Sequence, residues 1–165
     1  MLPFLFAGCG SVTPYQGIGK NKEGGYSSTR RSDDSYSVTY QGTEYSQRQQ
    51  VYDYTLLRSA ELTLECGYTY FTVLSDDDRS RNTYRYNPGM PASRETEYRT
   101  SPLGTPYTYT TYSPATTGQS VPIKIPAYTF TIKMYNESNV PRPPSGHARE
   151  AAPLISQLKA KYGLK

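Results

Sequence analysis

The sequence is poor in the residues that most often carry catalytic and metal chemistry. It contains one histidine, His147, two cysteines, Cys9 and Cys66, and no tryptophan. A single histidine excludes a metal site built from several histidines, and its place among prolines and glycine predicts a solvated loop residue. We therefore predict no catalytic residues, no metal site and no cofactor, and we expect that the protein is not an enzyme.

Aliphatic residues are also scarce. Hydrophobic residues make up 35% of the 165 residues even with 18 tyrosines counted, whereas about 45–50% is usual in globular chains. The sequence has no run of about 18 apolar residues, which a membrane-spanning helix of ordinary length requires. Length and composition therefore predict one domain whose core is confined to part of the chain.

Charge of one sign is nowhere concentrated. The chain has 18 basic and 14 acidic residues, a formal net charge of +4. Nucleic-acid-binding modules usually present a concentrated basic face, so we expect no nucleic-acid partner. The sequence gives no indication of the oligomeric state.

The amino terminus resembles an export signal that ends in a lipobox. Residues 1–8 are apolar or small and lead into Cys9, the position at which a lipobox cysteine receives a diacylglyceryl group. We expect residues 1–8 to be the remnant of a signal peptide and Cys9 to be the lipidation site. The apolar stretch is short and no Lys or Arg precedes it, so the alternatives are a start farther upstream or an ordinary cysteine. Gly10 follows the sorting pattern of outer-membrane lipoproteins.

The rest of the chain is expected to divide into a tether, a domain and a long excursion. Residues 9–34 are rich in Gly, Ser and Lys and predict a lipidated flexible tether. Residues 35–74 and 121–165 carry the periodic apolar patterns and predict a single α+β domain. Residues 75–120 are rich in Ser, Thr, Tyr and Pro, and are expected to form an excursion within that domain because they can bury little aliphatic surface.

A strand, a helix and a second strand are predicted in succession. Apolar and polar residues alternate over residues 36–40, which is the period of a half-buried strand. Residues 47–66 predict a helix, and the aromatic and β-branched residues 68–74 predict the second strand. A right-handed crossover would place the two strands parallel, with the helix over one face of the sheet.

The helix has recognisable ends and two distinct faces. Ser46 and Gln49 predict a capping box at its start, and Gly67 predicts its end. The face expected in the core carries Leu56, Leu57, Ala60 and Leu64. The opposite face carries Arg58, Glu61 and Glu65, with Arg58 as a surface ion partner of Glu61.

Two later elements complete the predicted fold. Residues 127–135 alternate as a strand does, with Tyr128, Phe130, Ile132 and Met134 on one side. A stripe at helical spacing, formed by Leu154, Ile155, Leu158 and Tyr162, predicts a C-terminal helix that docks on the sheet. The expected fold class is therefore α+β: a strand-helix-strand core with a small mixed sheet, a late strand and a C-terminal helix.

The tyrosines of the excursion are the main candidates for a binding surface. They lie among arginines, and both residue types favour protein interfaces because each buries apolar area while keeping a polar tip. The candidate partner-binding residues are Tyr84, Arg85, Tyr86, Tyr98, Arg99, Tyr107, Tyr109 and Tyr112. The alternative is that these tyrosines fill exposed strand positions, notably over residues 107–112.

Two further patterns have simpler explanations. Oxygen-bearing side chains alternate from Asp76 to Asn82 as they do at the start of a calcium loop, but Arg81 stands where that loop needs glycine. We therefore predict an acidic turn after the second strand. Cys66, near the end of the helix, is expected to be a small buried thiol, and the alternative is a reactive thiol.

The middle of the chain resembles a known family. The agreement covers residues 24–74, with a weaker match over residues 127–135. It rests on Gly25-Tyr26-Ser27, on Gly42-Thr43-Glu44-Tyr45-Ser46, on the run from Leu56 to Glu65, and on Gly67, Tyr68 and Phe71. These segments are similar to small proteobacterial outer-membrane lipoproteins of unassigned function, the Caulobacter-type lipoprotein family. The resemblance implies an exported, acylated protein with a strand-helix-strand core.

The sequence therefore predicts a lipoprotein of the outer membrane, on its periplasmic face, that acts as a protein-binding or scaffolding accessory of the cell envelope. The expected partners are the membrane, through the lipid on Cys9, and an envelope protein. The alternative is a glycan- or peptidoglycan-binding module that uses the surface tyrosines for stacking.

Overall fold

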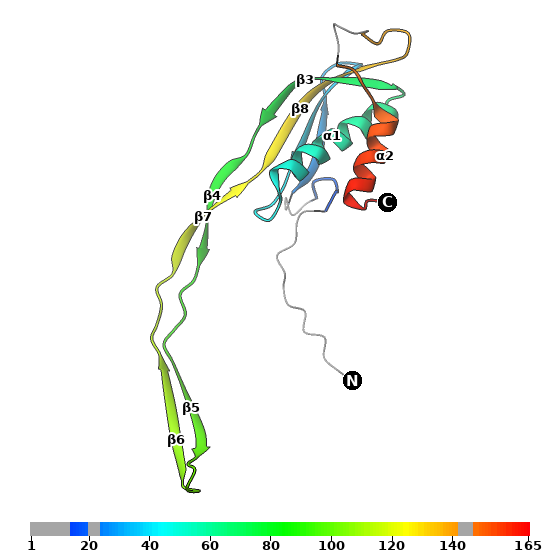
Figure 1. Ribbon diagram of the computed structural model, residues 1–165. Coiled ribbons are helices and arrows are strands. Elements are labelled where there is room, and N and C mark those ends of the chain that lie inside the picture. The colour runs from blue at the N-terminus through cyan, green and yellow to red at the C-terminus, as the bar shows by residue number, and fades with distance from the viewer. Residues whose placement is uncertain (1–13, 20–23, 142–146) are drawn as a thin grey trace. The chain divides into compact units, whose positions relative to one another are not determined.

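The computed structural model describes residues 14–19, 24–141 and 147–165. The predicted signal remnant and the lipidation site Cys9 lie outside these residues. The chain divides into two compact units (Figure 1). The first combines the residues up to Asn82 with Lys124–Lys165, and the second is Thr83–Ile123.

The first unit has the predicted α+β fold. Its elements are β1 (Gly25–Arg30), β2 (Ser35–Gln41), α1 (Arg48–Glu65), β3 (Tyr70–Asp78), β8 (Ala127–Tyr135), β9 (Arg149–Glu150) and α2 (Ala151–Tyr162). The second unit is formed by β5 (Ser93–Thr100), β6 (Pro106–Ser113) and most of β4 (Arg81–Asn87) and β7 (Gln119–Ile125).

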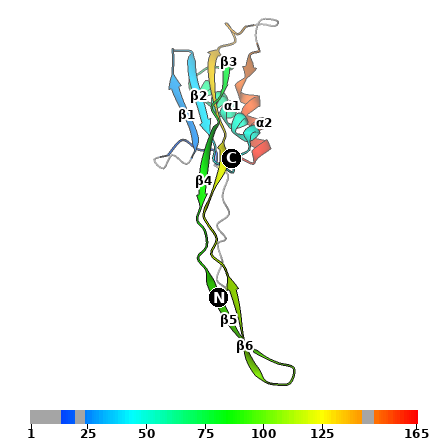
Figure 2. The same ribbon diagram turned by 90° about the vertical axis from the view of Figure 1, so that its left-hand side faces the viewer.

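The five strands of the first unit form one sheet in the order β1-β2-β8-β3-β9, and neighbouring strands are antiparallel (Figure 2). Strands β2 and β3 are both antiparallel to β8, so they run in the same direction, as predicted for the strands that flank the helix. They are not neighbours, because β8 lies between them. Among the described residues, parallel pairing is limited to an isolated bridge between Gly17 and Tyr26, so the sheet is mixed only through that bridge.

Helix α1 is close to the predicted span, but it begins differently. Gln47 precedes the first turn without a side-chain cap, and the Ser46 hydroxyl accepts a hydrogen bond from the Thr43 N–H at 2.9 Å. The predicted capping box of Ser46 and Gln49 is therefore wrong, because Ser46 stabilises the turn that precedes the helix. The helix ends as predicted, with Gly67 at a φ of 82° in the left-handed conformation.

Helix α1 is buried on more than one side, because it lies against the sheet and α2 packs beside it (Figure 1). Leu57 is fully buried, as predicted, whereas Leu64 on the same face is 42% exposed. The prediction for Leu64 is wrong, because burial along this face ends at Ala60, one turn earlier. Thr55, Ser59 and Thr63 are buried as well, and each hydroxyl donates to the carbonyl one turn earlier at 2.7–2.8 Å.

The C-terminal helix, α2, packs chiefly against α1 and β9. This differs from the predicted docking on the sheet, because α1 already covers that face. Ala151 and Leu158 are the buried residues of α2, and both join the main core. The helix ends at Gly163, which has a left-handed φ of 64°.

Strand β8 has the predicted span and the predicted alternation of faces. Phe130, Ile132 and Met134 are buried, whereas the residues between them are only half-buried. Because β8 is the central strand of the sheet, these side chains lie at the middle of the core. The main core combines Val38, Phe71, Phe130, Ile132 and Met134 of the sheet with Leu56, Leu57, Ala60 and Leu62 of α1 and with Ala151 and Leu158 of α2.

The predicted tether of residues 9–34 is wrong for most of its described part. Strand β1 pairs with β2 along its whole length. The Tyr15 ring packs at centroid distances of 5.1–6.4 Å against the rings of Tyr26, Tyr40 and Tyr54. Tyrosine rings thus supply the apolar burial that this aliphatic-poor segment otherwise lacks.

Backbone contacts also hold the segment before β1. The Tyr26 N–H donates to the Gln16 carbonyl at 2.8 Å, and the Ile18 N–H donates to the Tyr26 carbonyl at 2.9 Å. Gly25 has a φ of 131°, and a β-carbon there would lie 2.6 Å from the Gln16 oxygen. Only glycine allows this close approach.

Candidate functional site

The predicted partner-binding residues all lie on strands of the second unit. Strand β4 carries Tyr84, Arg85 and Tyr86, β5 carries Tyr98 and Arg99, and β6 carries Tyr107, Tyr109 and Tyr112. Strands β5 and β6 form an antiparallel hairpin, and every residue of both strands is exposed. The predicted strand over residues 107–112 is confirmed, but it belongs to this separate two-stranded sheet and not to the sheet of the first unit.

The β5–β6 hairpin presents tyrosine and arginine on both faces. Residues opposite each other in an antiparallel pair share a face. The pairing places Arg99, Tyr107 and Tyr109 on one face and Arg94, Tyr98 and Tyr112 on the other. The Arg99 guanidinium lies 5.0 Å from the Tyr109 ring centroid, and that of Arg94 lies 5.9 Å from the Tyr112 centroid. The predicted residues are therefore not one patch, since they are divided between β4 and the two faces of the hairpin.

Two exposed apolar side chains of this unit are not among the predicted partner-binding residues. Leu103 is 94% exposed and Met90 is 74% exposed. Leu103 lies at the hairpin turn, where the Gly104 N–H donates to the Ser101 carbonyl at 2.8 Å and the Ser101 N–H donates to the Thr105 carbonyl at 2.9 Å. Pro102 followed by Gly104 is typical of such a turn, so the sequence does contain a signal for the hairpin turn that carries Leu103.

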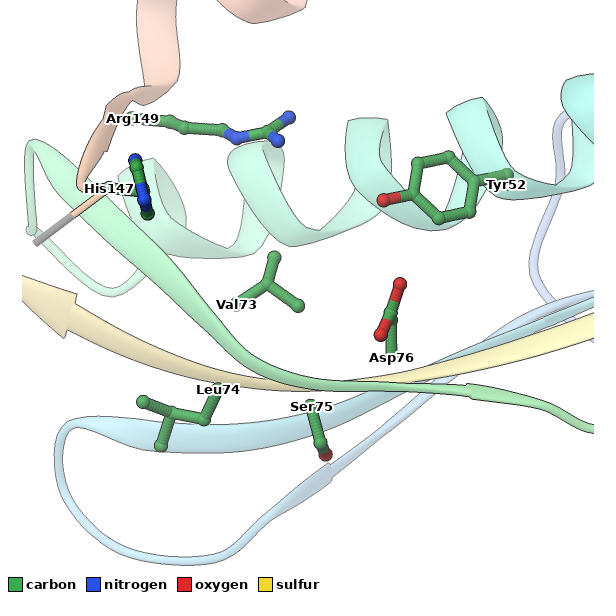
Figure 3. Close-up of a pocket in the computed structure, with 7 residues that line it drawn as sticks. All are labelled: Tyr52, Val73, Leu74, Ser75, Asp76, His147 and Arg149. Carbon is green, nitrogen blue, oxygen red and sulfur yellow. The ribbon is translucent and has the colours of Figure 1, made fainter.

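A second candidate site is a pocket of about 250 Å³ in the first unit (Figure 3). It is lined by Tyr52, Val73, Leu74, Ser75, Asp76, His147 and Arg149. A register shift between Val73 and Ser75 places Val73 and Asp76 on the same side of β3, facing Tyr52, while Ser75 points to the other side (Figure 3). The Ser75 hydroxyl therefore does not face His147, which is exposed.

The acidic residues after Leu74 lie within β3 and not in the predicted turn. Strand β3 extends to Asp78, whose carboxylate accepts hydrogen bonds from Arg48 at 2.6 Å and from the Ser80 N–H at 2.8 Å. The hydrogen bonds from Ser80 hold the pKa of Asp78 below its usual value. Among the described residues, no three His, Cys, Asp or Glu side chains are placed to hold a metal ion.

A buried carboxylate ties α1 to α2. Asp53 is 6% exposed and accepts hydrogen bonds from Lys161 at 2.6 Å, Tyr162 at 2.7 Å and Gln49 at 2.9 Å. Burial alone would raise the pKa of this carboxyl, but the three hydrogen bonds outweigh burial and hold the pKa of Asp53 below its usual value. This network is structural, because its members join two helices.

The stability that Asp53 contributes should be lost at acidic pH. Because its pKa is lower in the folded protein than in the unfolded chain, the contribution is fully present above about pH 4 and is lost as the pH falls through the lowered pKa. Chemical denaturation at a series of pH values should show a steeper acid loss for the native sequence than for Asp53→Asn. Equal slopes for the two proteins would contradict the network.

The predicted ion pair of Arg58 with Glu61 is present, but it lies in a half-buried cluster and not on the surface. The Arg58 side chain is 13% exposed and lies 2.7 Å from Glu65 and 3.7 Å from Glu61. Its guanidinium is 4.7 Å from the Tyr26 ring centroid. The Tyr15 hydroxyl donates to Glu61, and burial raises the pKa of Tyr15 above its usual range. The predicted surface position is wrong because Tyr26 lies over Arg58 and Tyr15 contacts Glu61 on this face of α1.

Cys66 is half-buried, whereas the sequence predicts a buried thiol. It follows the last turn of α1, at the edge of the main core. Its interaction with Tyr36 raises the pKa of that tyrosine. The position gives Cys66 a packing role.

Comparison of the chain with protein-family models, with curated proteins and with solved structures found no match. In the part of the chain that the structure describes, neither helix has the length and apolar character needed to cross a membrane.

Proposed function

We propose that this chain is a lipoprotein anchored through Cys9 to the periplasmic face of the outer membrane, where it acts as a protein-binding or scaffolding accessory and not as an enzyme. The observation that carries the proposal is the β5–β6 hairpin, whose residues are all exposed and which presents tyrosine and arginine on both faces. These residue types are enriched at the centres of protein interfaces. A two-stranded hairpin is marginally stable in water by itself, so a partner that covers it would also stabilise it.

The position of Tyr15 supports attachment close to the membrane. Tyr15 packs into the first unit six residues after Cys9, and six residues span at most about 20 Å. A lipid on Cys9 would therefore keep the five-stranded sheet near the membrane surface. The lipobox pattern and the resemblance to outer-membrane lipoproteins support the same proposal.

Replacing Cys9 should abolish membrane attachment. In protein from its native host, we expect Cys9 to carry acyl chains, which hold the protein in the membrane fraction because together they bury many methylene groups. Cys9→Ser should move the protein to the soluble fraction or leave it uncleaved. Mass spectrometry that finds an unmodified Cys9 in the native protein would contradict the anchor.

Truncating the exposed side chains of the hairpin should weaken partner capture. Tyr98 is 88% exposed and Leu103 is 94% exposed, so replacing both with alanine should leave the fold intact. If they contact a partner, capture from crosslinked envelopes should fall about tenfold or more, as for truncated interface anchors. Leu64→Ala is the matched control, because it removes a leucine that is 42% exposed in the first unit and lies outside both candidate sites. Equal capture by all three proteins would rule out the hairpin as the binding element.

Glycan or peptidoglycan binding is the second candidate function. The observation in its favour is that Tyr107 and Tyr109 share one face of β6 and are 47% and 50% exposed. Arg99 lies over the Tyr109 ring, however, so a sugar that stacked there would have to displace the guanidinium. Protein binding is therefore the better supported candidate. Co-sedimentation with purified peptidoglycan that is lost in Tyr109→Ala would reverse this order.

A further inference from the structure

The two edges of the β5–β6 hairpin differ in charge. Strand β6 carries no charged residue from Pro106 to Ser113, whereas β5 carries Arg94, Glu95, Glu97 and Arg99. Within the second unit, β6 pairs only with β5, so its other edge is open. Natural proteins place charges on exposed edges to prevent the addition of further strands. The β5 edge is protected in this way, and the β6 edge is not.

The turn fixes which backbone groups of β6 point outward. The Ser101 N–H donates to the Thr105 carbonyl, and hydrogen-bonded and non-bonded pairs alternate along an antiparallel ladder. Counting from this bond along the register, the bonded pairs are Arg99 with Tyr107, Glu97 with Tyr109 and Glu95 with Thr111. The N–H and carbonyl groups of Thr108, Thr110 and Tyr112 therefore point away from β5.

Prolines limit the length of the open edge. Pro106, which has no N–H, falls in the outward-facing set at one end of β6, and Pro114 follows the strand at the other end. Proline is tolerated on a strand edge and stops further pairing there. The segment left free to take up another strand is residues 107–113.

We infer that this edge of β6 pairs antiparallel with the same edge of a second copy of the chain, giving a four-stranded sheet in the order β5-β6-β6-β5. The inference rests on the proposed role of the hairpin as the binding element, and it identifies a second copy of the chain as a partner of that hairpin. A two-fold axis makes the contact self-complementary, because the same strand is used by both copies. The added strands would relieve the marginal stability of an isolated hairpin.

The side chains of β6 suit pairing with themselves. Apart from Pro106 and Ser113 at its ends, the strand consists of threonine and tyrosine. It carries no charge, so no like charges face each other across the axis. Cross-strand threonine pairs are favourable, and the chain already forms such pairs between Thr96 and Thr110 at 3.1 Å and between Thr39 and Thr129 at 2.8 Å. Strand β5 would instead bring four charged residues from each copy to the axis, which favours β6 as the pairing edge.

Two matched proline substitutions test this inference. Thr96 and Thr110 lie opposite each other in a pair that is not joined by backbone hydrogen bonds. The N–H of Thr96 therefore points to the open edge of β5, and that of Thr110 points to the open edge of β6. Thr110→Pro removes a donor from the β6 edge, Thr96→Pro removes one from the β5 edge, and both spare the backbone bonds between β5 and β6. Both also remove the same hydrogen bond between the two threonine side chains, so that loss is matched between the variants. Sedimentation velocity of the full chain in a Cys9→Ser background should show a dimer whose Kd rises at least tenfold in Thr110→Pro and is unchanged in Thr96→Pro.

A disulfide scan gives a second readout that does not depend on a proline. In a background with Cys9→Ser and Cys66→Ser, single cysteines placed from Thr108 to Tyr112 should crosslink two copies most efficiently at the residue nearest the two-fold axis. Cysteine at Thr96 should not crosslink, because the two β5 strands would be separated by both β6 strands, about 14 Å apart.

Several outcomes would overturn the inference. If the chain stayed monomeric at all concentrations up to about 1 mM, the inference would be wrong, because a Kd above that value corresponds to very weak binding. Equal loss of the dimer in Thr96→Pro and Thr110→Pro would place the contact elsewhere. A monomer whose capture of a different envelope protein depends on Thr110 would overturn the second copy as occupant but leave the proposed function standing. Unchanged envelope capture by a chain without the hairpin would instead remove the proposed function.

Discussion

Leu57→Ala should lower the free energy of unfolding by about 2–5 kcal/mol, the usual cost of truncating a buried leucine. Leu57 is fully buried and belongs to the core that α1 shares with Phe130 and Ile132 of β8. Its removal would leave a cavity that the central strand of the sheet cannot fill without moving. Urea denaturation followed by circular dichroism measures the loss.

The control for this change is Leu64→Ala on the same helix. Leu64 lies two helical turns after Leu57, on the same face of α1, but it is 42% exposed. Its truncation should therefore cost about 1 kcal/mol or less. Similar small losses for both variants would show that the orientation of α1 described here is wrong.

Removing Thr83–Ile123 and joining Asn82 to Lys124 through a short Gly-Ser linker should leave a cooperative thermal transition. None of the buried core residues lies in the deleted segment, and the strands at its two ends, β4 and β7, pair with each other. We expect the melting temperature to change by no more than about 4–8 °C, which corresponds to about 1 kcal/mol for a small domain.

The opposite result would have a clear meaning. If the deletion variant lost its cooperative transition, as judged by circular dichroism during heating, the exposed strands would be part of the folding unit. The tyrosines would then serve the structure, which is the alternative that the sequence leaves open.

The elements with regular apolar periods could be predicted from the sequence. The alternation of Phe130, Ile132 and Met134 predicts β8, and the run around Leu57 predicts α1 almost to its ends. Gly67 marks the end of α1 because its left-handed conformation is costly for other residues. These signals are local, and local pattern is what a single sequence records best.

The arrangement of the sheet could not be predicted in the same way. Strand β8 enters between β2 and β3 after the chain has passed through the whole second unit, and no local pattern reports such a long-range pairing. The described part of the predicted tether has the glycine and serine content of a linker, yet it contains strand β1 of the sheet. Its two tyrosines, Tyr15 and Tyr26, provide the burial that fixes it.

The residue types of the candidate site could be predicted from the sequence, but the arrangement of these residues on the hairpin could not. Tyrosine and arginine in the excursion were recognised, whereas the pairing that divides Tyr98 and Tyr109 between two faces could not be read from the sequence. The tip residue Leu103 was missed, although the glycine after it is a recognisable turn signal. The contrast between a charged β5 and an uncharged β6 is visible only when the two strands are known to form a hairpin.

Capture of an envelope partner by the full chain and by the variant lacking Thr83–Ile123 tests the central claim most directly. Both proteins are produced in the native host, crosslinked in intact envelopes, purified in parallel and compared by quantitative mass spectrometry. If the hairpin is the binding element, the full chain should capture a partner that the deletion variant, still acylated and folded, does not. Capture of the same partner in equal amounts by both proteins would contradict the account.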